Sequence, residues 1–217
     1  MRIGVFDSGV GGLSVAWAVQ KAFPGIPVDY ASDTKNVPYG DKTPAEMVRC
    51  ALEVLRPMAE TCDVIVIACN SLTTNGIAQL RRELAVPLVG IEPMVKPAAG
   101  LTKTGVFAVC ATSATLRSER YAWLKREYAE GMRVLEPDCS EWARMIESDA
   151  MGRDEIRRLV DTVCDQGADV IVLGCTHYHW IEQSVLEAAD GRAIVLQPEE
   201  AVVDQLRSVL KDLGQPV

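Results

Sequence analysis

The chain is 217 residues long, 48% of its residues are hydrophobic, and its formal net charge is −8. This length can bury the core of one or two domains, since single domains cluster at about 100–150 residues. The acidic balance and the lack of a run of Lys or Arg argue against a nucleic-acid-binding protein, because nucleic-acid affinity comes mainly from neutralising phosphates.

The N-terminal sequence starts directly on an apolar strand, RIGVF, and lacks the basic segment, apolar stretch and cleavage site of a signal peptide. Apolar runs elsewhere fall short of the roughly 20 residues that a membrane helix needs. Seven cysteines are an odd number in a chain without an export signal. We therefore expect reduced thiols, a cytoplasmic location and no membrane partner.

Short apolar stretches bounded by Gly, Pro, Asp or Asn predict strands. In chain order these cover residues 2–6, 27–31, 63–68, 86–90, 104–110, 132–135, 169–174 and 193–197. Amphipathic stretches predict helices between them, among others at 43–61, 116–129 and 153–166. Apolar strands separated by helices indicate parallel sheets covered on both faces. We predict an α/β protein built from two similar lobes.

The chain also repeats itself. Residues 63–69 read DVIVIAC and residues 169–175 read DVIVLGC, the string GVF at 4–6 recurs at 105–107, and 86–93 resembles 192–199. Offsets of 101 to 106 residues indicate a duplicated domain, because solenoid repeats are only about 20–50 residues long. We place the boundary between the lobes near 93–102, a segment with two prolines and a glycine.

Each copy of the repeat ends a buried strand on a cysteine, Cys69 or Cys175, followed at once by polar residues. Ligands of parallel sheets bind just beyond the carboxyl ends of the strands, where both thiols fall. We therefore interpret the pair as catalytic, able to take a proton from one face of a carbon and return it to the other. Four other cysteines are interpreted as small core residues: Cys50, Cys62, Cys110 and Cys164. Cys139 stays ambiguous.

Such a reaction needs one thiolate as base and one thiol as acid, and backbone N–H groups at a helix start after the cysteine would favour the thiolate. Asp7 and His177 stand at strand ends and are the candidates to manage the proton. Asp7 has an alternative role as the cap of the next helix. The glycines of DSGVGGLS (7–14) let the backbone approach a carboxylate or phosphate, but Ser14 replaces the third glycine of GxGxxG, so a nucleotide site is weakly indicated.

The string CTHYH raises a second alternative, a zinc site. Cys175, His177 and His179 alternate along the chain, and Cys69 could complete a tetrahedral set. Ligands adjacent in one strand rarely converge, and no C-x-x-C spacing accompanies them, so catalysis remains the preferred interpretation. We expect His179 at the surface or at the rim of a cleft.

Five strings occur in order along the chain: IGVFDSGVGGLSV (3–15), DTKNVPYGDKT (33–43), ACNS (68–71), the ATSAT…S segment (111–118) and LGCTHY (173–178). Together they resemble glutamate racemase, of the cofactor-independent aspartate/glutamate racemase superfamily. The resemblance implies two α/β lobes with pseudo-twofold symmetry, an active site in the cleft between them, and no PLP, metal or nucleotide. It also implies that the C-terminal residues return to the first lobe, which gives lobes of 1–97 plus 200–217 and of 98–199.

Carried over by position, the resemblance implies that Cys69 exchanges the proton of the D-isomer and Cys175 that of the L-isomer, with Asp7 and His177 assisting. Glu147 falls where the family has a glutamate near the site, with an exposed helix surface as the alternative. The residues implied to bind the amino acid are Asp7, Ser8, Pro38, Tyr39, Gly40, Cys69, Asn70, Ser71, Thr112, Thr115, Cys175, Thr176 and His177. Short hydroxyl and amide side chains are suitable donors for a dianionic substrate.

The implied reaction is the interconversion of L- and D-glutamate, which supplies D-glutamate for peptidoglycan and so serves cell wall biogenesis and cell shape. The chain departs from the family in its short length, in Ser71 and Ala114, and in residues 139–146 (CSEWARMI). Three other functions stay open: racemisation of aspartate or another amino acid with the same thiols, a non-catalytic ligand-binding protein, and, weakest, an NAD-dependent oxidoreductase. The sequence also leaves open whether the protein is a monomer or a homodimer.

Overall fold

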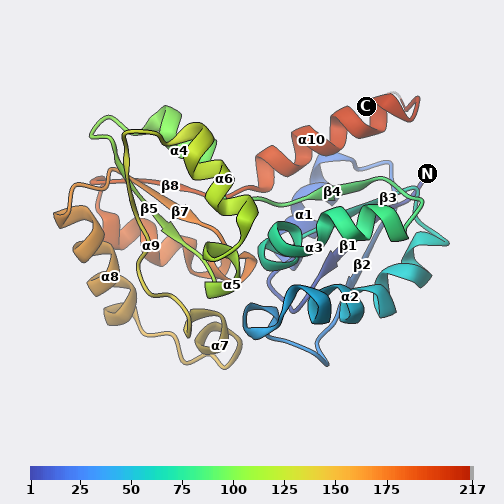
Figure 1. The fold of residues 1–217 in the computed structure, drawn as a ribbon, viewed down its shortest axis with the longest axis horizontal. Helices are drawn as coiled ribbons and strands as arrows, with labels where there is room; N and C mark the ends of the chain where they lie inside the picture. Colours follow the sequence, from blue (N-terminus) through green and yellow to red (C-terminus); the bar gives the residue numbers. More distant parts are fainter. Residues whose placement is uncertain (216–217) are drawn as a thin grey trace. The chain divides into compact units, whose positions relative to one another are not determined.

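The computed structural model describes residues 1–215 and contains two four-stranded parallel sheets with helices packed on them (Figure 1). All the predicted strands are confirmed: β1 (Ile3–Asp7), β2 (Val28–Ser32), β3 (Val64–Ile67), β4 (Leu88–Gly90), β5 (Val106–Cys110), β6 (Arg133–Leu135), β7 (Val170–Leu173) and β8 (Ile194–Leu196). The predicted α/β class with parallel sheets is therefore confirmed.

The α-helices occupy the segments between the strands. They are α1 (Leu13–Ala22), α2 (Pro44–Ala59), α3 (Asn70–Glu83), α4 (Val95–Leu101), α5 (Ser113–Leu116), α6 (Glu119–Tyr128), α7 (Trp142–Glu147), α8 (Arg153–Asp165), α9 (Glu182–Ala189) and α10 (Glu199–Asp212). Two 3₁₀ helices are η1 (Tyr39–Asp41) and η2 (Thr176–Ile181). In the described part of the chain, no helix is both long enough and apolar enough to cross a membrane.

Two of the three predicted helices have the expected extent, and one begins later than predicted. Helix α2 starts where Pro44 suits the first turn and Thr43 caps it through a capping box with Glu46. The helix expected at 116–129 is α6, which begins only at Glu119, and Leu116 instead ends the separate short helix α5. The break comes at Ser118, whose hydroxyl accepts a hydrogen bond from the backbone N–H of Tyr121 and so starts a new helix.

The chain separates into two units. The first comprises Met1–Glu92 and the chain from Pro198 onward, and the second comprises Pro93–Gln197. The boundaries that we expected, after residues 97 and 199, fall a few residues later. The difference has a physical reason at α4, because Val95 and Ala98 are buried in a core of the second unit together with Phe107 and Val109.

Both sheets have the same order of strands, β2-β1-β3-β4 in the first unit and β6-β5-β7-β8 in the second. Side chains alternate between the two faces of each sheet, as the two-residue period of a strand requires. In the first sheet Val64 and Val66 face a core shared with α1 and α10. In the second sheet Ile171 and Leu173 face a core shared with α8 and α9, whereas Val170 and Val172 face α4 and α6.

The helix that follows the last strand of each sheet belongs to the other unit. Helix α4 comes after β4 but lies in the second unit, and α10 comes after β8 but lies in the first. Val202, Leu206 and Leu210 of α10 are buried in the core of the first unit. The two units thus exchange their terminal helices.

The sheet registers define which residues of the two units are equivalent. Gly4 pairs with Ile65 and Ala108 pairs with Ile171, and the two isoleucines hold the same place in the DVIV strings. The counterpart of Gly4 is therefore Ala108, so the prediction that 4–6 and 105–107 correspond is wrong by three residues. Continued to the strand ends, this register sets Asp7 against Ala111.

Candidate active site

In the first unit Cys69 stands at the junction of β3 and α3. It is the residue that caps the start of α3, with extended backbone, and its side chain is buried. Its Sγ lies 3.4 Å from the hydroxyl of Ser8, which follows the end of β1. Because β1 and β3 are neighbours in a parallel sheet, their carboxyl ends bring these two residues together.

Asp7 is the last residue of β1 and is fully buried. Its Oδ2 accepts hydrogen bonds from the backbone N–H groups of Gly12 at 2.8 Å and of Gly9 at 3.4 Å. Asp7 had the alternative role of capping the next helix, but it does not occupy the cap position of α1; its carboxylate instead holds the loop through these two hydrogen bonds. The position that caps α1 is Gly12, where an added Cβ would lie 2.6 Å from the Cβ of Asp7. The loop therefore needs glycine there.

The pKa of Cys69 is raised to about 12, chiefly by burial and further by the negative charge of Asp7. Hydrogen bonds from the Ser8 side chain and from the backbone of Ser8 and Leu72 act in the opposite direction. A helix start after the cysteine was expected to favour the thiolate. The helix start is present, but for Cys69 burial outweighs it, and the thiol form is the stable one.

The PYG turn lies in the first unit as well. Pro38 precedes η1 after a cis peptide bond, and Tyr39 and Gly40 form its start. The buried Tyr39 donates a hydrogen bond to Asp33 at 2.8 Å, and burial and Asp33 raise its pKa. The charge of a Cys69 thiolate adds to this rise, so Tyr39 lies within electrostatic reach of that thiol.

The buried polar residues after Cys69 differ in how they are satisfied. The backbone carbonyl of Ser71 accepts a hydrogen bond from the side-chain amide of Asn75 in α3. Asn70 is 3% exposed, and neither its side-chain oxygen nor its side-chain nitrogen has a hydrogen-bond partner among residues 1–215. A buried amide without partners costs about 1–3 kcal/mol, so a functional role, a water molecule or another bound group is needed to explain it.

In the second unit Cys175 follows β7 as Cys69 follows β3. Its Sγ lies 3.7 Å from Nδ1 of His177, and Nε2 of His177 lies 2.8 Å from Oε1 of Glu147. Cys175 and His177 are buried, whereas the Glu147 side chain is 29% exposed. With an ionised Glu147 accepting from Nε2–H, Nδ1 presents a lone pair to the thiol. The three residues form a chain along which a proton can leave Cys175.

Helix α7, which carries Glu147, is held against η2 by contacts besides the His177–Glu147 hydrogen bond. The hydroxyl of Tyr178 donates to the backbone carbonyl of Cys139 at 2.7 Å. The ring of Trp142 meets that of Tyr178 edge to face, with centroids 5.4 Å apart. A hydrogen bond to Cys110 and burial raise the pKa of Cys139. Cys139, ambiguous from sequence, is thus a protonated core thiol in the same cluster as Cys175.

The other cysteines are free thiols too, and Cys50, Cys62 and Cys110 are buried as expected, whereas Cys164 is partly exposed. Cys175 is followed by the 3₁₀ helix η2, so the two cysteines precede different kinds of helix start. His179, expected at the surface or at the rim of a cleft, is 8% exposed and so does not lie on the open surface. Its place in η2, which packs against α7 and α9, explains the difference.

The three threonines predicted to bind the substrate, Thr112, Thr115 and Thr176, lie just after strands β5 and β7 of the second unit. Thr112 caps α5 by accepting from the N–H of Thr115, and its hydroxyl donates to that of Thr115 at 3.1 Å. Thr176 is buried directly after Cys175. In the sheet register Thr112 is the counterpart of Ser8 and Ala111 that of Asp7. The second unit thus has no carboxylate at the position of Asp7. Its carboxylate near Cys175 is that of Glu147, which contacts His177 and not the thiol itself.

Sequence reasoning missed the residues that support these side chains. Tyr30 donates a hydrogen bond to the carbonyl of Gly9 at 2.6 Å, and Asp33 accepts from both Tyr39 and Asn36. Asp33 belongs to the quoted string DTKNVPYGDKT, and this signal could have found it. Tyr30 precedes that string and carries no signal of its own.

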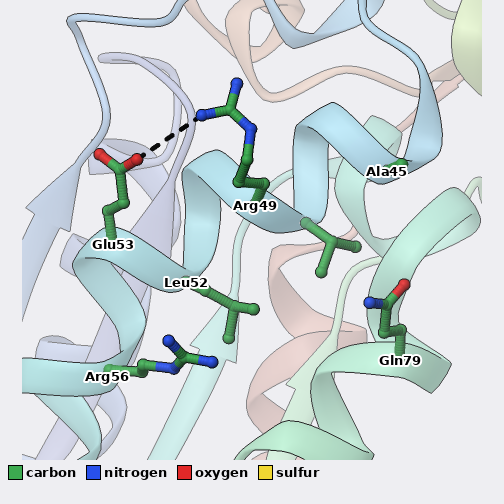
Figure 2. Close-up of a pocket in the computed structure, with 7 residues that line it drawn as sticks. Ala45, Arg49, Leu52, Glu53, Arg56 and Gln79 are labelled. Atoms are coloured by element: carbon green, nitrogen blue, oxygen red, sulfur yellow. Dashed lines mark ion pairs between the residues drawn. The ribbon is translucent and has the colours of Figure 1, made fainter.

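A separate pocket of about 400 Å³ opens beside α2 and α3 (Figure 2). Its lining consists of Ala45, Val48, Arg49, Leu52, Glu53, Arg56 and Gln79. Arg49 forms an ion pair with Glu53 at 3.8 Å, and Arg56 forms one with Glu83 at 3.1 Å. Both arginines are thus already paired with glutamates, and we do not assign this pocket to the site. Within residues 1–215 no group of three or more His, Cys, Asp or Glu side chains is placed to hold a metal ion.

Comparison with known proteins places these features in a family. A family model described as Asp/Glu/Hydantoin racemase matches residues 14–206. A glutamate racemase of Ectopseudomonas mendocina is 37% identical over 215 residues, which is 96% of this chain and 81% of that protein. A glutamate racemase of Methylococcus capsulatus is 37% identical over 218 residues, 98% of this chain and 80% of that protein.

Solved structures agree with the sequence comparison. Glutamate racemase of Escherichia coli, solved with L-glutamate and the activator UDP-MurNAc-ala, aligns with a TM-score of 0.89 at 26% identity. The alignment covers 97% of this chain and 82% of that one. Glutamate racemase of Aquifex pyrophilus aligns with a TM-score of 0.75 at 31% identity, over 98% of this chain and 85% of that one.

Proposed function

The chain belongs to the Asp/Glu/Hydantoin racemase family, and from this premise we propose that it interconverts L- and D-glutamate, with Cys69 and Cys175 as the two acid–base groups. The observation that carries the proposal is the pair of buried thiols at equivalent strand ends with unlike neighbours. Cys69 stands beside Ser8 and near the charge of Asp7, whereas Cys175 stands beside His177 and Glu147.

The unlike neighbours support opposite protonation states before the reaction. Burial and Asp7 keep Cys69 protonated at neutral pH, which makes it the acid. Cys175 can transfer its proton to Nδ1 of His177, and Glu147 then stabilises the resulting imidazolium. The resting enzyme in this proposal carries one thiol and one thiolate, as a two-base racemisation needs.

In the forward reaction the Cys175 thiolate removes the α-proton of L-glutamate, and the electron pair of the broken C–H bond passes to the α-carbon and its carboxylate. Cys69 then gives its proton to the opposite face of that carbon. The products are D-glutamate, a Cys175 thiol and a Cys69 thiolate, and the reverse reaction starts from that state. The carbanion is steeply uphill, so preorganised donors and exclusion of water must stabilise it.

The proposed binding groups are polar side chains that follow β3 and β7, the strands that precede the two cysteines, and their neighbouring strands β1 and β5. The unsatisfied amide of Asn70 offers both a donor and an acceptor beside Cys69. The hydroxyls of Ser8, Thr112 and Thr176 are further donors for the two carboxylates of glutamate. The chemistry needs only protein groups. We further propose that the product serves peptidoglycan synthesis in the cytoplasm.

The test is incubation of the purified protein with L-glutamate in heavy water. The expected result is D-glutamate that carries deuterium at the α-carbon. Cys69→Ser and Cys175→Ser should each abolish racemisation in both directions, because each direction uses both thiols. Cys164→Ser, at a partly exposed position in α8, is the matched control and should retain activity. Absence of both D-glutamate and α-deuterium would sink the proposal.

A substrate panel read by circular dichroism separates the remaining alternatives. Turnover of aspartate without turnover of glutamate would show that the same two thiols act on another substrate. Tight binding of glutamate without turnover, unchanged in Cys69→Ser, would instead indicate a ligand-binding protein.

A further inference from the structure

Tyr30 links the second strand of the first unit to the loop that carries Asp7 and Ser8. It lies in β2 opposite Val5 of β1, and its ring packs against the buried core that includes Val5. Its hydroxyl extends past the end of β1 and donates a hydrogen bond to the carbonyl of Gly9 at 2.6 Å. The ring thus belongs to the core, and only the hydroxyl reaches the loop.

Gly9 is a sensitive point in that loop because it directly follows Ser8, whose hydroxyl lies 3.4 Å from the Cys69 thiol. The Gly9 N–H also points to Oδ2 of Asp7. Glycine has little conformational preference of its own, so the peptide that carries the Gly9 carbonyl needs an external restraint. The hydroxyl of Tyr30 restrains that carbonyl, and the clamp of Asp7 on Gly9 and Gly12 restrains the N–H side.

The Tyr30 hydroxyl stays a donor throughout the accessible pH range. Burial raises its pKa, and the negative charges of Asp7 and of a Cys69 thiolate raise it further. A hydrogen bond with the side chain of Ser32 has the opposite, weaker effect. Tyr30 is therefore within electrostatic reach of both groups that define the first half of the site, and it remains protonated when either is charged.

We propose that Tyr30 is a positioning residue for proton transfer at Cys69: by holding the Gly9 carbonyl, its hydroxyl fixes the loop that sets Ser8 against the thiol. This inference rests on the proposed two-thiol racemisation and deepens it. It predicts an effect confined to one of the two proton transfers, because the hydrogen-bond chain of Cys175 lies in the other unit.

The test compares Tyr30→Phe with Tyr128→Phe. Both variants lose one hydroxyl, but Tyr128 lies in α6 of the second unit, where its ring contacts Trp123 and Lys96. Tyr30→Phe should lower kcat about tenfold, which corresponds to about 1.4 kcal/mol of barrier, with KM changed less than about twofold. Tyr128→Phe should match the wild type. Circular dichroism checks that each variant is folded.

Isotope effects distinguish positioning from a general loss of structure. With α-deuterated D-glutamate, whose proton goes to Cys69, Tyr30→Phe should raise the isotope effect on kcat/KM, because that transfer becomes more rate-limiting. With α-deuterated L-glutamate, whose deuteron goes to Cys175, the isotope effect should fall, because the step that breaks that bond becomes less rate-limiting. Glu147→Gln, which perturbs the other half, should shift the two isotope effects in the opposite sense.

Ser32→Ala provides a second variant, with a smaller change in the same direction, should Tyr30→Phe fold poorly. Wild-type kcat and isotope effects in a folded Tyr30→Phe would overturn the inference. A fall in kcat with both isotope effects unchanged would also overturn it, since it would reveal a merely structural role. Failure of the wild type to racemise glutamate would instead refute the proposed function, and so the two failures are distinguishable.

Discussion

The substitution Gly12→Ala should damage the first half of the site through steric contact alone. Gly12 has φ −68° and ψ −3°, a conformation that alanine adopts readily, so the backbone gives no penalty. The added Cβ, however, would lie 2.6 Å from the Cβ of Asp7 and 3.2 Å from that of Ala68. Carbon atoms in contact normally stay about 3.5–4.0 Å apart. Asp7 and the loop must therefore separate by about 1 Å.

The magnitude follows from these contacts. Neither neighbouring atom is the end of a flexible side chain, so the strain cannot be relieved by a rotamer change. Overpacking of this kind costs about 1–3 kcal/mol of the free energy of unfolding. The hydrogen bond from the Gly12 N–H to Asp7 lengthens at the same time. A misplacement of about 1 Å can cost about 10²-fold in rate. We therefore expect a folded Gly12→Ala variant whose kcat is lower by up to about 10²-fold.

The assay pairs Gly12→Ala with Gly25→Ala. Gly25 lies in the same unit without positive φ, and a Cβ added there would meet no atom within 4 Å. Gly25→Ala should keep full activity and be neutral or stabilised by up to about 1 kcal/mol through the unfolded chain. Urea unfolding followed by circular dichroism gives the stability, and racemisation gives kcat. Equal stability and equal kcat in the two variants would refute the steric reasoning.

Three further predictions concern single side chains of the site. Burial raises the pKa of Cys69 from 9.0 to about 12, so the folded state holds an extra proton and the free energy of unfolding should fall between these pH values as pH rises. Cys69→Ser should remove up to about 1.4 kcal/mol per pH unit from that slope in urea titrations, and equal slopes would contradict the assignment. Asn70→Ala should raise KM without lowering the free energy of unfolding, since the amide has no partner to lose among the described residues; clear destabilisation would show otherwise. Glu147→Gln keeps an acceptor for His177 but removes the charge, and should lower kcat more than it changes KM. The matched Glu141→Gln, at an exposed position bonded within the same segment, should be silent, and equal losses in both would exclude a role for the charge.

The strands could be predicted because their cause is local. DVIV at 63–66 and 169–172 is apolar, branched and bounded by Asp, and the same string gave both cysteines their place at a strand end. The start of α6 after Ser118 was less visible, because Ser118 reads equally well as a helix residue or as a cap. Its side-chain bond to Tyr121 decides the matter.

The missed features depend on contacts between residues far apart in the chain. Glu147 and His177 were both expected in the site, but they are 30 residues apart, and no spacing rule predicts the hydrogen bond between them. His179 was expected at the surface or at the rim of a cleft, and tertiary packing of η2 excludes the open surface. The pKa of Cys69 has the same origin: a helix start is readable from sequence, whereas the burial that outweighs it is not.

The exchange of α4 and α10 between the units has a consequence for the order of folding during synthesis. The second unit has all its elements once the ribosome has passed Gln197. The first unit, although it is translated earlier, still lacks Val202, Leu206 and Leu210, which close its core. The half that emerges first is thus the half whose core is completed last.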